Sequence, residues 1–208
     1  MYKRQGLRRA TGELVSYVNS DDLYCPGALQ RVAEEFSAHP ETDFVHGDGD
    51  VIDELGRLQW EWLSRSYDYS VLTTYHFLWN KITNYILQPA TFWRKAVLDR
   101  IGYLDESFHF AMDLEYWVRA GQAGLKFRHI PVKLAKLRDA PGTKSRSSPT
   151  VFWPDQLEIY RRHRGSSSLA PYFAYYYYNL ALEHNFDLQK VSLKGQQAFE
   201  RWAGLPSG

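Results

Sequence analysis

Two adjacent carboxylates, Asp21 and Asp22, are the residues of this sequence best suited to metal chemistry. They follow an apolar, β-prone run over residues 14–18 and precede Pro26, which fits the first turn of a helix. We therefore expect them at the carboxyl end of a buried strand, where open α/β sheets bind ligands. Hard cations such as Mg²⁺ or Mn²⁺ prefer oxygen ligands, usually together with phosphate oxygens. A simpler reading stands beside this one, because Asp side chains also cap helix N-termini.

A third carboxylate, Asp113, stands at the expected start of a helix whose apolar face is Leu114, Trp117 and Val118. At the N-cap or in the first turn, a carboxylate is favoured by free backbone N–H groups and by the helix dipole. Local sequence alone explains Asp113 equally well as a plain helix cap.

Apolar periodicity predicts the elements that position these acids. Helical spacing runs from Pro26 to about His39. Short apolar runs at 43–48 and 51–58 predict a strand and a hairpin whose turn carries Gly56. This alternation favours a mostly parallel, layered α/β sheet. Further helices are expected at 67–79, 94–101 and 114–121, an extended piece within 82–93, and strands at 125–130 and 132–137.

The last part of the sequence has the composition of a helical extension. Residues 138–149 are rich in Pro, Gly and Ser and predict a loop or linker. We expect an α/β domain over residues 1–147 and a helical region over residues 148–208. The tyrosine-rich tract 172–178 favours packing on a domain surface or a dimer over sugar stacking or membrane contact. The expected helices span 151–163, 169–186 and 188–202.

Composition limits the classes of function. The 208 residues suffice for one well-buried domain, and a formal charge of +1 argues against a nucleic-acid partner. The single cysteine, Cys25, cannot form an internal disulfide. No apolar run approaches the roughly 20 residues needed to span a bilayer. We expect a cytoplasmic chain.

Several other polar residues are expected to be structural. His46, His109 and His129 lie in apolar surroundings without the spacing of metal ligands, and are interpreted as satisfied core or surface histidines. Asp48 and Asp50 end a short predicted strand, and a solvated turn explains them better than a second acidic site.

Taken in order, a set of short motifs resembles family 2 glycosyltransferases with the GT-A fold, which are inverting sugar transferases of polysaccharide assembly. The likeness covers roughly residues 5–147, and the co-occurrence of the pieces is more specific than any one of them. The matching pieces are Gly6-Leu7, Ala10-Thr11-Gly12-Glu13, Asn19-Ser20-Asp21-Asp22, Tyr24-Cys25-Pro26-Gly27-Ala28-Leu29, Gly47-Asp48, Ile52-Asp53-Glu54-Leu55-Gly56-Arg57, Gln88-Pro89-Ala90-Thr91-Phe92, Gly102-Tyr103-Leu104-Asp105-Glu106 and Met112-Asp113-Leu114-Glu115-Tyr116-Trp117-Val118-Arg119.

The resemblance implies a partial GT-A (Rossmann-like) layered sheet and assigns roles to five residues. Asp21 and Asp22 correspond to the motif that binds a divalent cation, Mn²⁺ or Mg²⁺, and Asp113 to the general base. Gln88 and Thr91 lie in the segment beside the donor and acceptor sugars. The implied partners are a nucleotide-sugar donor and a saccharide, lipid-linked or other hydroxyl acceptor. Association with the inner face of the membrane and a homodimer remain open alternatives.

Two departures from the family pattern leave a second hypothesis open. Only twenty residues precede Asp21, too few for a βαβ unit of roughly 30 residues, so we expect a fragment or a shortened chain that lacks the nucleotide-binding half. Ala140 stands where a histidine ligand is expected, next to Asp139, which could substitute. The alternative is a catalytically inactive remnant that serves as a binding or assembly module. A different phosphate-metal enzyme would leave the downstream motifs unexplained.

Overall fold

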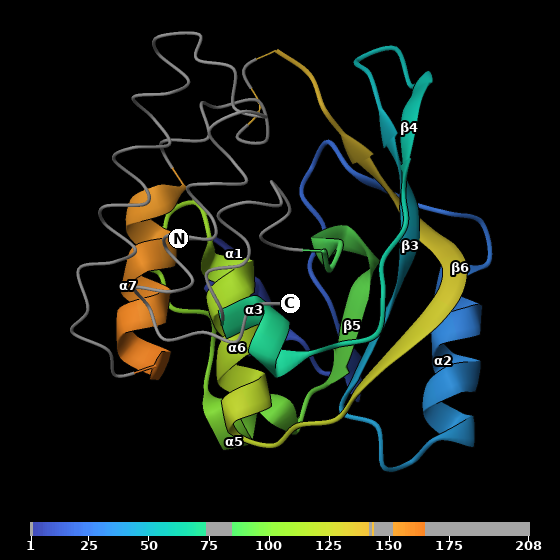
Figure 1. Cartoon of the computed structure of the whole chain (residues 1–208). Helices are drawn as coiled ribbons and strands as arrows, with labels where there is room; N and C mark the ends of the chain where they lie inside the picture. Colours follow the sequence, from blue (N-terminus) through green and yellow to red (C-terminus); the bar gives the residue numbers. More distant parts are fainter. Residues whose placement is uncertain (1, 74–84, 142, 144–151, 165–208) are drawn as a thin grey trace, which may run out of the picture.

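The computed structural model describes residues 2–73, 85–141, 143 and 152–164 of the chain. Its centre is a six-stranded sheet in the order β1-β5-β3-β6-β2, with β4 paired to β3 (Figure 1). The strands are β1 (Leu14–Val15), β2 (Leu23–Tyr24), β3 (Phe44–Ile52), β4 (Leu58–Trp62), β5 (Thr91–Arg94) and β6 (Phe127–Arg138). The helices are α1 (Tyr2–Arg9), α2 (Ala28–Ala38), α3 (Tyr69–Thr73), α5 (Val97–Ile101), α6 (Met112–Gln122) and α7 (Trp153–Arg164), with a 3₁₀ turn at Gln88–Ala90.

The expectation of a mostly parallel sheet is wrong. In the described part of the chain, only β3 and β6 run parallel, whereas the pairs β1–β5, β2–β6, β3–β4 and β3–β5 are antiparallel. The connection from β3 to β4 is too short for a crossover, which forces an antiparallel hairpin. The other pairs join segments far apart in the sequence, so local alternation of helices and strands could not set their direction.

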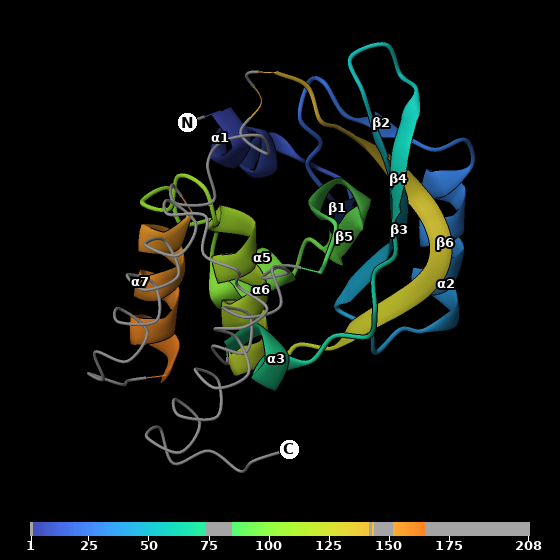
Figure 2. The same cartoon turned by 45° about the horizontal axis from the view of Figure 1, so that its top comes forward.

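The sheet branches along β3. Strand β6 pairs with one side of β3 along its whole length, while β5 pairs on the other side with Phe44–His46 and β4 with Gly49–Ile52. Because β5 and β4 share that side, the sheet divides beyond His46. Figure 2 shows β4 and β5 diverging in this way.

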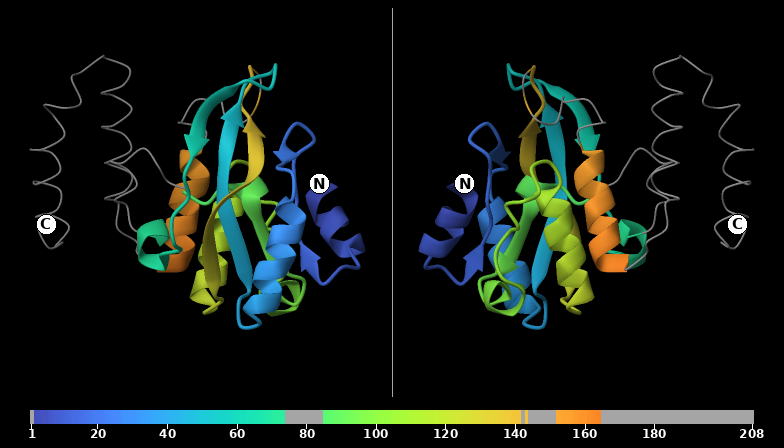
Figure 3. Two further views of the ribbon diagram at one scale, coloured as in Figure 1. Left: turned by 90° about the vertical axis from the view of Figure 1, so that its right-hand side faces the viewer. Right: turned by 90° about the vertical axis from the view of Figure 1, so that its left-hand side faces the viewer.

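Helices cover the two faces of the sheet in layers (Figure 3). On one face, Val32 and Phe36 of α2 pack against a buried cluster that includes Val45 and Leu134. On the other face, α6 supplies Trp117, which is fully buried in the larger core cluster. None of the helices in the described ranges is long and apolar enough to cross a membrane.

Several predicted elements are confirmed with altered bounds. The helix expected from Pro26 to His39 is α2, and the hairpin turn carries Gly56 at φ 80°. The expected strand over residues 14–18 shortens to Leu14–Val15. The two strands expected at 125–130 and 132–137 form the single strand β6, in which the pairing register shifts beside Pro131 because proline has no N–H to donate. The helices expected at 169–186 and 188–202 lie outside the described residues, and no finding tests the division at residue 147.

Gly49 is required by close packing within β3. A Cβ atom at this position would overlap the side chain of Leu87 and lie 2.6 Å from the carbonyl oxygen of Ala135. Gly49→Ala should therefore lower the free energy of unfolding by about 1–3 kcal/mol. In urea unfolding followed by circular dichroism, Gly6→Ala in α1 is the control, because none of the described residues lies within 4 Å of its Cβ position and its midpoint should not fall. A midpoint for Gly49→Ala equal to that of the unmodified protein would contradict the packing argument.

His46 is a core residue but not a satisfied one. Its side chain is fully buried, and neither ring nitrogen has a hydrogen-bond partner among the residues that the structure describes. Burial, with a smaller effect from the neighbouring His129, lowers the pKa of His46 from 6.5 to about 3. The unfolded chain therefore binds a proton that the folded protein does not, and stability is lost as pH falls from 6.5 towards 3.

We expect His46→Leu to flatten this acid dependence. The slope that it removes is up to about 1.4 kcal/mol per pH unit. The measurement is urea unfolding between pH 4 and 7 in steps, with His39→Leu as the control, since His39 is partly exposed on the end of α2. An unchanged slope in His46→Leu would show that His46 does not cause it.

Candidate active site

A cavity of about 1060 Å³ opens where the sheet branches. Strand β4 and the segment before β5 contribute to its wall, as do the loop after β1 and the start of α6. Four of the five predicted site residues line it, namely Asp21, Asp22, Gln88 and Asp113. The tertiary structure thus brings together acids that are far apart in the sequence.

Asp22 is a buried carboxylate held on both oxygens. Its Oδ1 accepts a hydrogen bond from the backbone N–H of Arg138 at 2.9 Å, and its Oδ2 accepts one from Nδ2 of Asn19 at 2.8 Å. It does not cap α2, whose N-cap is Gly27 without a side-chain cap bond. The capping interpretation is therefore wrong for Asp22. Burial raises its pKa, against the opposing effect of these hydrogen bonds.

Arg138 fixes the loop that carries the acids. Its Nε donates to the carbonyl oxygen of Asp21 at 3.0 Å, and its Nη1 donates to that of Asp53 at 2.7 Å. Arg138 is the last residue of β6, so the end of the parallel pair β3–β6 sets the position of Asp21 and Asp22. The sequence marked residues 138–149 only as a loop, and this role was missed.

Asp113 lies in the first turn of α6, as expected, but not at its N-cap. The N-cap is Ala111, and Oδ1 of Asp113 accepts from the backbone N–H of Leu114 at 2.9 Å. Unpaired N–H groups at a helix start favour a carboxylate there. The helix therefore presents Asp113 to the cavity in a favourable field.

Tyr17 lines the same cavity as Asp22 and Asp113 and was not predicted as a site residue. Burial raises its pKa well above the ordinary value, and the charges of Asp113 and Asp22 raise the pKa further. Both carboxylates therefore act electrostatically on one phenol. The Nζ of Lys3 lies 4.4 Å from the centre of the Tyr17 ring, and both residues line the cavity. In the sequence Tyr17 resembled one more apolar residue of a strand.

Gln88 and Thr91 differ in placement although they belong to one motif. Gln88 lines the cavity, and its Nε2 donates to the carbonyl oxygen of Tyr17 at 2.5 Å. Thr91 is fully buried in β5 and does not line the cavity. Its Oγ1 donates to the carbonyl oxygen of Leu87 at 2.8 Å. Contrary to the expectation of a sugar contact, Thr91 holds the turn that presents Gln88.

Asp48 and Asp50 do not form the solvated turn that was expected. They lie within β3, because pairing with β6 extends this strand to Ile52. Oδ1 of Asp48 accepts from the backbone N–H of Ser64 at 2.9 Å and lies 3.0 Å from Nε2 of His129. Both aspartates are structural, and neither lines the cavity.

The chemistry of the donor set fits a divalent cation with few protein ligands. In the described residues, no group of three or more His, Cys, Asp or Glu side chains is arranged to hold a metal ion. Asp21 and Asp22 nevertheless offer hard oxygen donors to one cavity. Mg²⁺ is commonly bound by one or two carboxylates completed by water and substrate phosphates. A nearby cation would also offset the burial that disfavours the charge of Asp22.

Aromatic side chains form much of the remaining wall. Trp60 and Trp62 come from β4, and Phe110 and Phe152 come from the segments before α6 and α7. Nε1 of Trp62 donates to the carbonyl oxygen of Tyr85 at 3.1 Å, which ties β4 to the segment before β5. The sequence showed the high aromatic content but did not distinguish wall residues from core residues.

Comparisons with known proteins find a distant sequence relative and a solved structure with a similar fold. The uncharacterized glycosyltransferase YwdF of Bacillus subtilis (strain 168) is 22% identical over 129 residues, which cover 58% of this chain and 43% of YwdF. The chain thus spans less than half the length of this curated relative. The crystal structure of S. aureus TarS aligns with a TM-score of 0.50 and 19% identity over 76% of this chain and 26% of TarS. No protein-family profile matches the chain. The likeness to TarS shows the fold, which is a mixed α/β fold with a curled sheet and covering helices.

Proposed function

We propose that the site transfers a sugar from a nucleotide-sugar donor to an acceptor hydroxyl, with inversion at the anomeric carbon. The observation that carries the proposal is that Asp21 and Asp22 line one cavity with Asp113, which is far from them in the sequence. The name of the relative YwdF, a glycosyltransferase, supports sugar transfer in general. The donor sugar, the inversion and the assignment of residues are part of the proposal.

In this reaction Asp113 accepts the proton of the acceptor hydroxyl. The oxygen then attacks the anomeric carbon and forms the new glycosidic bond, while the bond from that carbon to the diphosphate oxygen breaks with its electron pair on the diphosphate. Attack and departure occur on opposite faces, which inverts the configuration. A carboxylate at the start of α6 suits the role, because a backbone hydrogen bond orients it and it lines the cavity.

Asp21 and Asp22 would hold the divalent cation that this chemistry uses. A bound cation neutralises the charge that develops on the departing diphosphate. Asn19 and the backbone of Arg138 orient Asp22 for this task through its two oxygens. Such outer contacts fix a carboxylate ligand and tune its affinity.

The alternative, an inactive remnant that serves as a binding module, is not favoured. The described residues keep Asp21, Asp22 and Asp113 together in one large cavity. They also keep Asp22 buried, an arrangement that costs stability and that a module without chemistry would not need.

Calorimetric titration tests the nucleotide part of the proposal. We expect a saturable heat when uridine or guanosine diphosphate is added with Mn²⁺, and loss of this heat when EDTA replaces the cation. Absence of heat from a chain with a folded circular-dichroism spectrum would contradict it. The configuration of the transferred sugar, determined by NMR of the reaction product, tests inversion separately.

A further inference from the structure

The start of the helix that carries Asp113 is held by a carboxylate from another helix. Oδ2 of Asp155, in α7, accepts hydrogen bonds from the backbone N–H groups of Phe110 at 2.7 Å and Ala111 at 3.1 Å. Ala111 is the N-cap of α6 and makes no side-chain cap bond of its own. Asp155 therefore supplies, from outside, a charged acceptor to the two amides that lead into this helix.

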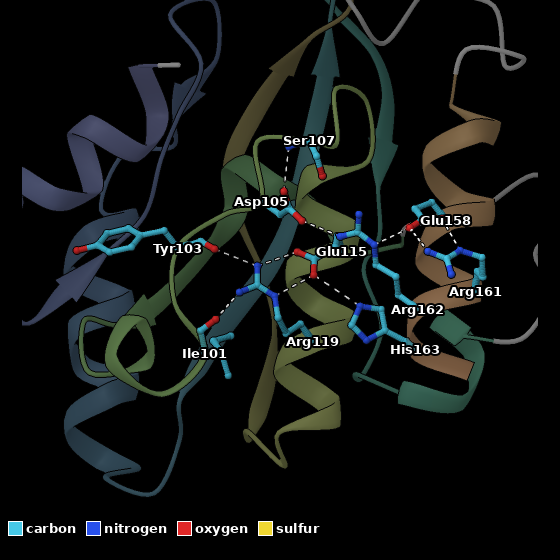
Figure 4. Close-up of polar contacts among 10 residues, drawn as sticks. All are labelled: Ile101, Tyr103, Asp105, Ser107, Glu115, Arg119, Glu158, Arg161, Arg162 and His163. Atoms are coloured by element: carbon cyan, nitrogen blue, oxygen red, sulfur yellow. Dashed lines mark hydrogen bonds and ion pairs between the residues drawn. The ribbon is translucent and has the colours of Figure 1, made fainter. Parts of the chain in front are cut away.

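Helix α7 also has independent anchors on the same region. Nη1 of Arg162 lies 2.8 Å from Oδ2 of Asp105, and Nε2 of His163 lies 3.6 Å from Oε1 of Glu115 in α6 (Figure 4). These contacts lie at the opposite end of α7 from Asp155. Loss of the Asp155 carboxylate would therefore leave α7 tied to α6.

The same end of α7 forms part of the cavity. Phe152 and Gln156 both line it together with Asp113, and the Gln156 side chain is only 6% exposed. The ring of Phe152 meets that of Phe110 edge-on, with the centroids 5.3 Å apart. The start of α7 thus contacts the start of α6 in two ways: through the aromatic rings in the cavity wall and through the hydrogen bonds of Asp155 to the backbone.

We propose that Asp155 is a positioning residue for Asp113, and that α7 is an integral part of the candidate active site. The Asp155 carboxylate fixes the backbone turn at Phe110 and Ala111, from which α6 directs Asp113 into the cavity. This inference rests on the proposed function, in which Asp113 is the base. A misplacement of about 1 Å in a reacting group costs about 10²-fold in rate.

The test uses a graded series in the full-length protein. Asp155→Ala removes both acceptor oxygens, whereas Asp155→Asn keeps one oxygen without the charge. We expect turnover to fall by about 10–100-fold in the alanine variant and by less in the asparagine variant. The KM for the donor and the calorimetric affinity for nucleotide diphosphate with Mn²⁺ should stay unchanged. Glu158→Ala is the matched control, because Glu158 lies in the same helix and pairs with Arg161 and Arg162 rather than with α6.

A structural measurement keeps this inference separate from the proposed function. Amide hydrogen exchange at Phe110 and Ala111 should become faster in Asp155→Ala and stay unchanged in Glu158→Ala. Slow exchange in both variants, or full turnover in Asp155→Ala, would overturn the positioning role. If the unmodified protein transfers no sugar, the proposed function fails. In that case, exchange at the amides of Phe110 and Ala111 still tests whether Asp155 holds the turn. Unchanged exchange in Asp155→Ala would show that it does not.

Discussion

Asp113→Asn should abolish sugar transfer, with turnover lower by about 10²–10⁴-fold, the usual contribution of a general base. The amide cannot accept the proton of the acceptor hydroxyl, but it keeps an oxygen for the backbone N–H of Leu114, so α6 should start unchanged. Calorimetric affinity for nucleotide diphosphate with Mn²⁺ should match that of the unmodified protein. The measurement is single-turnover transfer at saturating donor.

Asp99→Asn is the control for this variant. This variant makes the same change of side chain as Asp113→Asn. Asp99 is exposed on α5 and does not line the cavity. It should retain full turnover. Undiminished transfer by Asp113→Asn would remove Asp113 from the role of base, and a parallel loss of nucleotide binding would instead indicate that the variant damages the cavity.

Asp22→Asn should have the second large effect. It should weaken metal-dependent nucleotide binding and raise the stability of the metal-free protein. Without the carboxylate, binding of nucleotide diphosphate in the presence of Mn²⁺ should weaken by about 10–100-fold or more, the scale at which even outer contacts affect metal affinity. Transfer should be lost with it. In calorimetry without a cation, the variant and the unmodified protein should behave alike.

The same substitution should stabilise the protein at pH 7 in the absence of metal. Because burial raises the pKa of Asp22, the folded protein holds this proton more tightly than the unfolded chain, whose pKa is near 3.8. The free energy of unfolding therefore falls as pH rises through the interval from 3.8 to the raised pKa, and the cost is fully present above it. An asparagine avoids this cost and keeps an acceptor for the Arg138 N–H.

Thermal unfolding at pH 7 measures this effect, with Asp99→Asn as the control. We expect a higher midpoint for Asp22→Asn than for the unmodified protein without metal, and a gain from Mn²⁺ with nucleotide only in the unmodified protein. A lower midpoint would mean that the lost hydrogen bond from Asn19 outweighs the burial of the charge.

The two effects on stability have different structural origins. Two buried groups, Asp22 and His46, lower the stability of the folded protein in different pH ranges. Asp22 does so as pH rises above 3.8, and His46 does so as pH falls below 6.5. For Asp22 the proposed cation gives a reason, because a bound cation would stabilise the buried, charged carboxylate. His46 lies in β3 beneath the sheet branch and does not line the cavity, and its burial follows from its pairing between β5 and β6.

The sequence by itself determined which local segments form elements and which acids are candidates. Periodicity located α2, α6 and the β3–β4 hairpin, because a buried face recurs at helical or alternating spacing. The acid pair after a short strand and Asp113 at a helix start were visible for the same reason, since both are local features.

The tertiary structure alone decided how these pieces meet. Strand direction, the branching of β3 and the burial of Thr91 depend on pairing between distant segments, which local patterns do not encode. The roles of Tyr17 and Asp155 have the same origin, since each acts on residues remote in the sequence. An ordinary aromatic and an ordinary helix carboxylate become parts of a candidate active site only through what the fold places beside them.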